Sequence, residues 1–124
     1  MFPYWENQPL SGAVDYLDSC YGKLSRAAGG KEIIVETGWP SAGDPKGAAV
    51  PSPANAAEYF TGFTRWAEAK KVRYYYFEAF DEPWKAGREG SVGAHWGIWE
   101  SDGKLKASFR LGDRTTLLTG RRPA

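Results

Sequence analysis

Acidic side chains recur along this 124-residue chain where strands are predicted to end. Glu6 follows a short aromatic segment, Glu36 ends a β-branched run, and Glu78, Asp81 and Glu82 cluster at the end of a third run. Parallel α/β folds carry their active sites at the carboxyl ends of the strands, because the loops that follow the strands meet there. These carboxylates are therefore the first candidates for catalytic groups.

Two interpretations compete for a carboxylate at such a place. It can cap the next helix or pair with a surface lysine, since most acidic side chains in proteins are solvated. Glu36 differs because it ends an apolar strand and precedes Gly38 and Trp39. A carboxylate on a buried strand needs a partner or a chemical purpose, which favours a functional role for Glu36.

The cluster around Glu78 is predicted to lie close to Glu36. Side chains alternate along a strand, so Glu78 and Glu82 share one face of the segment 72–82. If this face is turned to the axis of a barrel, both carboxylates lie near Glu36. Like charges at that distance raise the pKa of one carboxyl unless a cation lies between them, and Lys85 is the candidate cation.

The elements that would position these groups alternate between strands and helices, which indicates a parallel sheet with right-handed crossovers. The second helix has the clearest start, with Ser52 as N-cap and Pro53 at the first helical position. Beyond residue 90 the pattern weakens to a short hairpin or loop at 96–104, and 115–118 is the only strand candidate in the tail. The predicted elements are a strand at 2–5, a helix at 11–28 capped by Ser11, a strand at 31–36, a helix at 53–71 and a strand at 72–80.

Composition narrows the classes of partner. Hydrophobic residues make up 42% and charged residues 25%, as in soluble globular domains. The six Trp and seven Tyr are suited to sugar rings as well as to protein interfaces. A net charge of +1 with no clustered basic face predicts that nucleic acid is not a partner.

Metal, cofactor and membrane partners are not expected either. Cys20 is the only cysteine and there is one histidine, so neither an internal disulfide nor a zinc site can form. The first residues lack a basic segment followed by an apolar one, and no apolar run reaches membrane-spanning length. As written, the chain is predicted to be cytoplasmic.

Two long motifs resemble glycoside hydrolase family 17, which contains β-1,3-glucanases and related bacterial glucan transglycosylases. Residues 36–43, ETGWPSAG, resemble the nucleophile signature of that family. Residues 77–85, FEAFDEPWK, with GAHWG at 93–97, resemble the bacterial form of the last barrel strand and the segment after it. Residues 2–6, FPYWE, resemble the sixth strand, and the likeness covers about residues 2–107.

The resemblance implies a partial (β/α)8 TIM barrel, an α/β fold with about strands 6 to 8 and their helices over residues 1–110, and an unassigned tail at 111–124. A complete barrel needs about 250 residues, roughly twice this length. The resemblance also implies a retaining mechanism with Glu36 as nucleophile and with Glu82, Lys85 and Glu89 in supporting roles. The candidate substrate-binding residues are Tyr4, Trp5, Glu6, Trp39, Glu78 and Trp84. Members of the family are often secreted or located at the cell envelope.

The general acid of the family lies at the end of the fourth strand, and no residue of this chain matches it. A nucleophile without its acid cleaves poorly or not at all. Glu78 or Glu82 could replace the acid only if it were within reach of the leaving oxygen.

A partial barrel has two open sheet edges, a surface that associates readily. We therefore expect a homo-oligomer that forms through these edges. Two function hypotheses remain at this stage. The first is a fragment of a retaining β-1,3-glucan hydrolase or transglycosylase that is expected to be inactive until missing strands are supplied. The second is a non-catalytic, self-assembling partial barrel that binds β-glucan.

Overall fold

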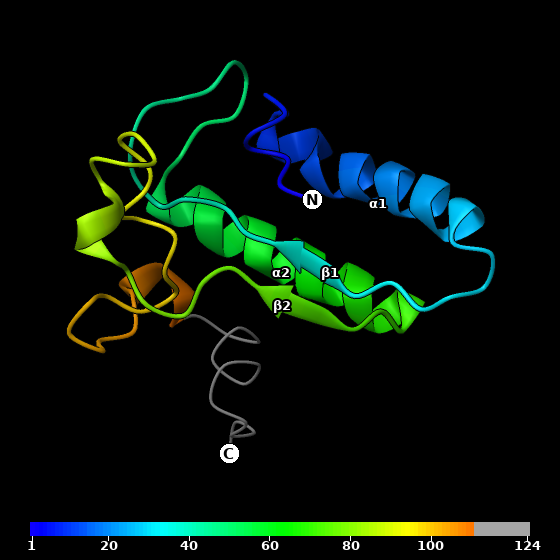
Figure 1. Cartoon of the computed structure of the whole chain (residues 1–124). Coiled ribbons are helices and arrows are strands. Elements are labelled where there is room, and N and C mark those ends of the chain that lie inside the picture. The colour runs from blue at the N-terminus through cyan, green and yellow to red at the C-terminus, as the bar shows by residue number, and fades with distance from the viewer. Residues whose placement is uncertain (111–124) are drawn as a thin grey trace.

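The computed structural model describes residues 1–110. Figure 1 shows α2 behind two neighbouring strands, with α1 alongside. This arrangement confirms the helix, strand, helix, strand part of the expected alternation, and one face of the sheet is covered by α2. The elements in chain order are α1 (Leu10–Ala27), β1 (Val35–Thr37), α2 (Pro53–Lys70), β2 (Tyr74–Tyr76) and the 3-10 helices η1 (Pro83–Lys85) and η2 (Ala107–Phe109).

The predicted start of α2 is confirmed. The hydroxyl oxygen of Ser52 accepts the backbone N–H of Asn55 at 2.9 Å, and Pro53 stands at the first helical position. This cap satisfies one of the N–H groups that a helix start leaves without an intrahelical partner. The helix presents one apolar side to the rest of the fold, and its buried residues are Ala56, Ala57, Tyr59, Phe60, Phe63, Thr64 and Ala67.

The predicted cap of α1 is wrong. The helix begins at Leu10 after Pro9, so Ser11 lies inside its first turn, and no side chain caps the start. The fixed φ of Pro9 (−66°) already sets the chain direction before the helix. The two helices are joined by the indole N–H of Trp66, which donates to Asp18 Oδ1 at 2.8 Å.

The strands are parallel and shorter than the predicted ranges 31–36 and 72–80. β1 pairs with β2 in a register that places Glu36 opposite Tyr75. Val35 and Thr37 are buried against α2, while Glu36 and Tyr75 are exposed on the other face. Pairing ends after β1 because residues 78–81 bond to residues 96–99 instead. The predicted alternation through 72–82 therefore does not extend beyond β2.

The backbone at Gly38 passes very close to the segment that follows β2. A Cβ at this position would lie 1.9 Å from the carbonyl oxygen of Phe77, so no residue with a side chain fits without moving the backbone. The Phe77 N–H also donates to the carbonyl of Thr37 at 2.7 Å. The end of β1 is thus held directly against the segment that follows β2.

The predicted strand at 2–5 is wrong. Trp5 N–H donates to Phe2 O at 3.0 Å and Glu6 N–H donates to Pro3 O at 3.1 Å, which closes two successive turns. A proline cannot donate to a strand ladder, and Pro3 lies within the turns. The terminal amine of Met1 donates to the carbonyl of Glu36 at 2.8 Å, and this hydrogen bond joins the segment to β1.

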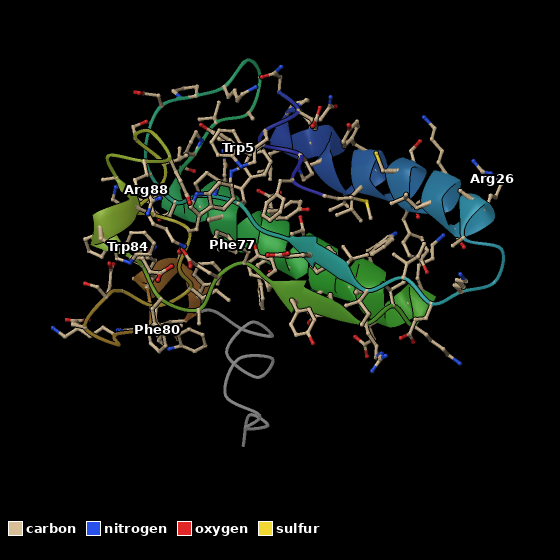
Figure 2. All side chains as sticks on the ribbon, in the orientation of Figure 1. Trp5, Arg26, Phe77, Phe80, Trp84 and Arg88 are labelled. Carbon is tan, nitrogen blue, oxygen red and sulfur yellow. The ribbon has the colours of Figure 1, made fainter. Side chains whose placement is uncertain are left out.

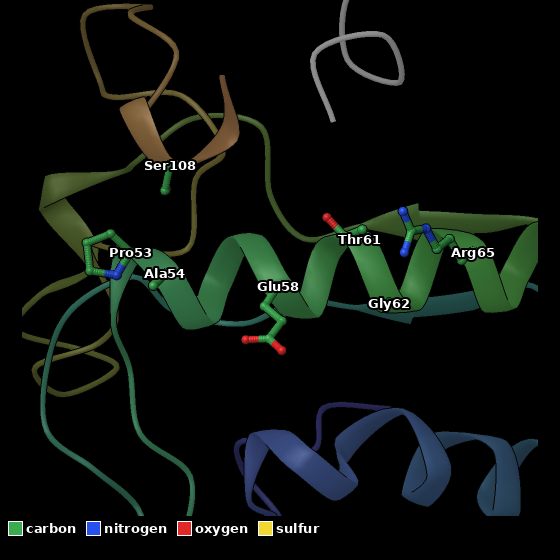
Figure 3. A pocket seen from close by; sticks show the side chains of 7 residues that line it. All are labelled: Pro53, Ala54, Glu58, Thr61, Gly62, Arg65 and Ser108. Atoms are coloured by element: carbon green, nitrogen blue, oxygen red, sulfur yellow. The ribbon is translucent and has the colours of Figure 1, made fainter. Parts of the chain in front are cut away.

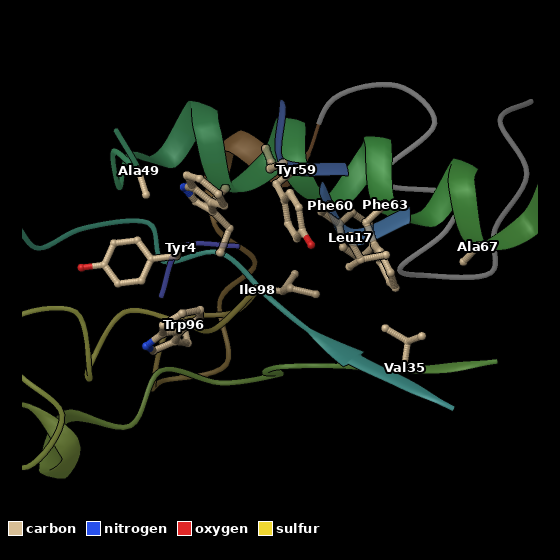
Figure 4. Packing of buried hydrophobic residues seen from close by; sticks show 14 of the residues in the cluster. Tyr4, Leu17, Val35, Ala49, Tyr59, Phe60, Phe63, Ala67, Trp96 and Ile98 are labelled. Atoms are coloured by element: carbon tan, nitrogen blue, oxygen red, sulfur yellow. The ribbon is translucent and has the colours of Figure 1, made fainter. Parts of the chain in front are cut away.

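The core is rich in aromatic rings, and it lies between the helices and the covered face of the sheet (Figure 4). Tyr59 and Phe63 of α2 are at most 1% exposed, and the ring of Phe60 packs edge-on against Tyr76 of β2 at 4.9 Å. The hydroxyl groups of Tyr59 and Thr37 lie 2.7 Å apart in this core.

The segment 96–105 forms a short hairpin-like turn, one of the two predicted alternatives. Trp99 makes an antiparallel bridge with Leu105 and a parallel bridge with Phe80. The strand candidate at 115–118 lies outside the described residues.

Candidate active site

Lys85 lies between two carboxylates, as expected from the sequence. Its ammonium is 3.0 Å from Glu78 Oε2 and also forms an ion pair with Glu82. The 3-10 helix η1 brings Lys85 within reach because Glu82 precedes it by three residues. The side chains of Lys85 and Glu78 are 10% and 14% exposed, so their contact is shielded from solvent, whereas Glu82 is 34% exposed. We call Glu78, Glu82 and Lys85 the acidic cluster.

The acidic cluster holds one carboxyl that titrates near neutral pH. Burial, followed by its hydrogen bond with Glu82, raises the pKa of Glu78 to about 7, although Lys85 opposes the shift. The hydrogen bonds of Glu82 with Glu78 and Lys85 lower the pKa of Glu82. Burial alone would lower the pKa of Lys85, but its bonds to the two carboxylates raise it. Near pH 7 the cluster can hold a proton on Glu78 beside a charged Glu82–Lys85 pair.

Glu36 is exposed on the sheet face that α2 does not cover. It is the central residue of β1 rather than the last residue of the strand, and its carboxylate is not buried as expected. Within residues 1–110 no hydrogen bond or ion pair links this carboxylate to the acidic cluster. The side chain is instead directed to the open side of the sheet, where a ligand can reach it.

Two of the predicted sugar-stacking residues lie in the core. Tyr4 is 4% exposed and donates its hydroxyl hydrogen to the carbonyl of Asp44 at 2.8 Å. Trp39 is 1% exposed, and its indole N–H donates to the carbonyl of Val50 at 3.1 Å. Rings buried in this way have no face available to a sugar, so both assignments are corrected. Aromatic residue type alone does not separate a stacking platform from core packing.

Trp5 and Trp84 remain accessible (Figure 2), at 40% and 61% exposure. Lys85 Nζ lies 5.5 Å from the Trp84 ring centre, which places this tryptophan next to the acidic cluster. Glu6 and Glu89 are both exposed. Glu89 follows the acidic cluster, and its backbone N–H donates to the carbonyl of Lys85 at 3.0 Å.

Sequence reasoning missed Lys106. Its ammonium is buried and donates to Asp81 Oδ1 at 2.8 Å and to the hydroxyl of Ser41 at 2.9 Å. Lysine is seldom buried without a partner, and no spacing in the sequence relates residue 106 to residues 41 and 81. Only the folded chain brings these three residues together.

A hollow on α2 lies away from the candidate catalytic groups. Figure 3 shows its lining, and its volume is about 820 Å³. None of the residues predicted to be catalytic lines it, so it is not the candidate active site. Its lining residues are Pro53, Ala54, Glu58, Thr61, Gly62, Arg65 and Ser108.

A family model described as the BtgE/BtgC glycoside hydrolase domain matches residues 1–97 of the chain. A crystal structure of the glycoside hydrolase family 17 β-1,3-glucanosyltransferase from Rhizomucor miehei superimposes with a TM-score of 0.81 at 37% identity. The chain belongs to glycoside hydrolase family 17. The α/β structure of residues 1–110 accordingly corresponds to part of the barrel of family 17 enzymes.

Other members of family 17 are similar over a comparable range. A glucan 1,3-β-glucosidase of Candida albicans is 36% identical over 117 residues, which cover 87% of this chain and 38% of that protein. An active-site mutant of the Rhizomucor miehei enzyme, solved with laminaritriose, is 36% identical, and the match covers 40% of its length. The chain thus spans about two fifths of the length of these relatives.

Within residues 1–110, no group of three or more His, Cys, Asp or Glu side chains is arranged to hold a metal ion. None of the helices in the same range is long and apolar enough to cross a membrane.

Proposed function

We propose that this chain forms the nucleophile-bearing part of a retaining β-1,3-glucan hydrolase or glucanosyltransferase. Glu36 is the nucleophile, and the segment corresponds to about strands 6 to 8 of the barrel. The observation that carries the proposal is the exposure of Glu36 on the uncovered sheet face, within the motif ETGWPSAG. The acidic cluster follows the neighbouring strand β2.

The proposed chemistry is a double displacement at the anomeric carbon. Glu36 forms a bond to C1 of a glucosyl residue while the bond from C1 to the leaving oxygen breaks, and a general acid protonates that oxygen. Water or a sugar hydroxyl then releases the glycosyl group, which distinguishes hydrolysis from transfer. No residue of the chain matches the acid of the family, so we expect turnover only when the rest of a barrel is present.

The proposed ligand is a β-1,3-linked glucan oligosaccharide. The Rhizomucor miehei relative was solved with laminaritriose, and we extend that ligand class to this chain. Trp5 and Trp84 are exposed aromatic residues able to stack on the C–H faces of glucosyl rings. We propose that sugar hydroxyl groups are bound, or the site supported, by Glu6, Glu78 and Glu89. We also propose that the charge of the site is set by Glu82 and Lys85.

An activated substrate tests the nucleophile without the missing acid. A 2-deoxy-2-fluoro-β-laminaribiosyl fluoride carries fluoride as a leaving group that needs little protonation, so Glu36 alone can displace it. We expect intact-protein mass spectrometry to show one added glycosyl group, on the peptide that contains Glu36. Glu36→Gln should abolish the label.

Glu32→Gln is the matched control for this experiment. Glu32 is also exposed and lies just before β1, but it pairs with Arg73 across the sheet edge and points to no proposed site. The label should persist in this variant. A label on a residue other than Glu36, or laminaritriose binding without any label, would instead support the non-catalytic glucan-binding module.

Self-association through the open sheet edges stays a prediction. The described sheet has two strands. Ile34, just before β1, is 44% exposed, and Tyr75, within β2, is 71% exposed. Exposed apolar surface at unpaired strand edges favours association. Sedimentation velocity at low micromolar concentration should show a dimer or larger species, and a monomer across that range would contradict the prediction.

A further inference from the structure

A buried ion pair lies next to the candidate active site and has no role in the proposed chemistry. Lys106 and Asp81 are each 8% exposed, and the two charged groups are 2.8 Å apart. Ser41, which is 6% exposed, accepts a second hydrogen bond from the Lys106 ammonium at 2.9 Å. We call Ser41, Asp81 and Lys106 the lysine network.

The lysine network joins three segments that are far apart in the sequence. Ser41 belongs to the loop after β1, five residues beyond Glu36, and its backbone N–H donates to the carbonyl of His95 at 2.9 Å. Asp81 follows β2 and directly precedes Glu82 of the acidic cluster. Lys106 supplies the third segment, so one ammonium group holds the other two segments together.

The lysine network also reaches Glu78 through the backbone. Lys106 N–H donates to the carbonyl of Ile98 at 3.2 Å, and Ile98 N–H donates to the carbonyl of Glu78 at 3.0 Å. Gly97 N–H donates to Asp81 Oδ1 at 2.8 Å. A Cβ on Gly97 would lie 2.2 Å from the backbone nitrogen of Asp81, so these backbones approach as closely as glycine permits.

Stability alone is a weak reason for such an arrangement. The cost of removing two charges from water often equals or exceeds their attraction, and an apolar pair of similar volume is frequently as stable. In some proteins a buried ion pair instead fixes geometry, because each charge is most stable in the position that keeps its partner. The lysine network occupies the place where the loop after β1 meets the segment that carries the acidic cluster.

We propose that the lysine network is a positioning device, which sets the loop after Glu36 against the segment that carries Glu78 and Glu82. Lys106, Asp81 and Ser41 are positioning residues, since none of them belongs to the proposed reacting groups. Any effect of these three residues on the reaction depends on the proposed function being right. Their effect on the position of Glu78 does not depend on it.

The test uses Glu78 as an internal reporter in the full chain. Burial is the main reason that the pKa of Glu78 is raised to about 7, while the neighbouring Glu82 and Lys85 contribute in opposite directions. If the lysine network is lost and the segment loosens, water reaches the carboxyl. We therefore expect the pKa of Glu78, followed by 13C NMR of the side-chain carboxyl, to fall toward its ordinary value.

The main variant is the charge-neutral double substitution Asp81→Asn/Lys106→Met. It removes both charges together, leaves no unpaired buried charge, and keeps an oxygen that can accept the Gly97 N–H. Ser41→Ala removes the two hydrogen bonds of the Ser41 hydroxyl, from the Lys106 ammonium and to the carbonyl of His95, but leaves the ion pair in place, so we expect a smaller shift in the same direction. If the double variant does not fold, Ser41→Ala decides the question.

Lys104→Met is the matched control, because Lys104 lies two residues away and its ion pair with Asp102 is exposed. In this control, the pKa of Glu78 should be the same as in the unchanged protein. Folded network variants with an unchanged Glu78 titration would overturn the proposal, since a purely stabilising pair does not move that pKa. Laminaritriose binding measured on the same samples separates the proposals: failure of the unchanged chain to bind contradicts the proposed function and leaves the Glu78 result standing.

Discussion

The two faces of the small sheet have opposite environments, although they share the same six residues of strand. Val35 and Thr37 point into the aromatic core and contact α2, whereas Glu36 and Tyr75 point to the uncovered side. Because side chains alternate along β1, the residue proposed to react lies on one face and its two buried neighbours lie on the other. We infer that stability depends on one face and the proposed function on the other, so that each can be changed separately.

The largest expected effect comes from the covered face. Phe63→Ala removes a ring that is fully buried between α2 and β2, and such truncations cost about 3–5 kcal/mol. Urea unfolding followed by tryptophan fluorescence measures the loss. Tyr75→Ala, on the uncovered face, should change the free energy of unfolding by less than about 0.5 kcal/mol. Equal losses in the two variants would contradict the separation of the faces.

A smaller effect is expected one residue from Glu36. Thr37→Val leaves the buried hydroxyl of Tyr59 without its partner, which should cost about 1–3 kcal/mol. Adding Tyr59→Phe to that variant removes the unpaired group and should restore part of the loss. Glu36→Ala, measured by the same urea unfolding, should be close to neutral. A large loss in Glu36→Ala would show that this residue also contributes to packing.

The starts of α1 and α2 differ in whether a serine caps the helix. Ser52→Ala removes the cap of α2 and should cost about 1 kcal/mol of stability. Ser11→Ala should cost nothing or stabilise slightly, because Ser11 lies inside α1 and alanine has the higher helix propensity. Differential scanning calorimetry of both variants distinguishes a cap from a helix interior. The reverse order of the two melting temperatures would restore Ser11 as a cap.

The acidic cluster should also make the free energy of unfolding depend on pH. Glu78 has a folded-state pKa of about 7, above its ordinary 4.5, so the folded chain binds this proton more tightly than the unfolded chain. The free energy of unfolding should therefore fall as the pH rises through this window. Glu82, whose pKa is lowered, acts in the opposite direction below that window. Urea unfolding of Glu78→Gln at several pH values should lack the decline between 4.5 and 7.

Local signals explain which parts of the molecule could be predicted. The cap and proline at the start of α2 and the place of Lys85 as the cation beside Glu78 and Glu82 depend on near neighbours, and both features are confirmed. The buried lysine depends on contacts across the chain, which no local pattern encodes. The turns at 2–6 are closed by local hydrogen bonds, and Pro3 is the local signal against a strand there. Aromatic side chains were the hardest to place, since Trp39 and Trp84 have the same chemistry but 1% and 61% exposure.

Gly38 changes how the motif ETGWPSAG can be used to classify other sequences. The close approach of the Phe77 carbonyl requires a glycine at that position, and burial of Thr37 and Trp39 constrains its neighbours. Thr37, Gly38 and Trp39 of the motif are thus required by backbone approach and core packing, whether or not the protein is catalytically active. A survey of related sequences should therefore score Glu36 separately, because a chain that has lost this residue can retain the rest of the motif and still fold.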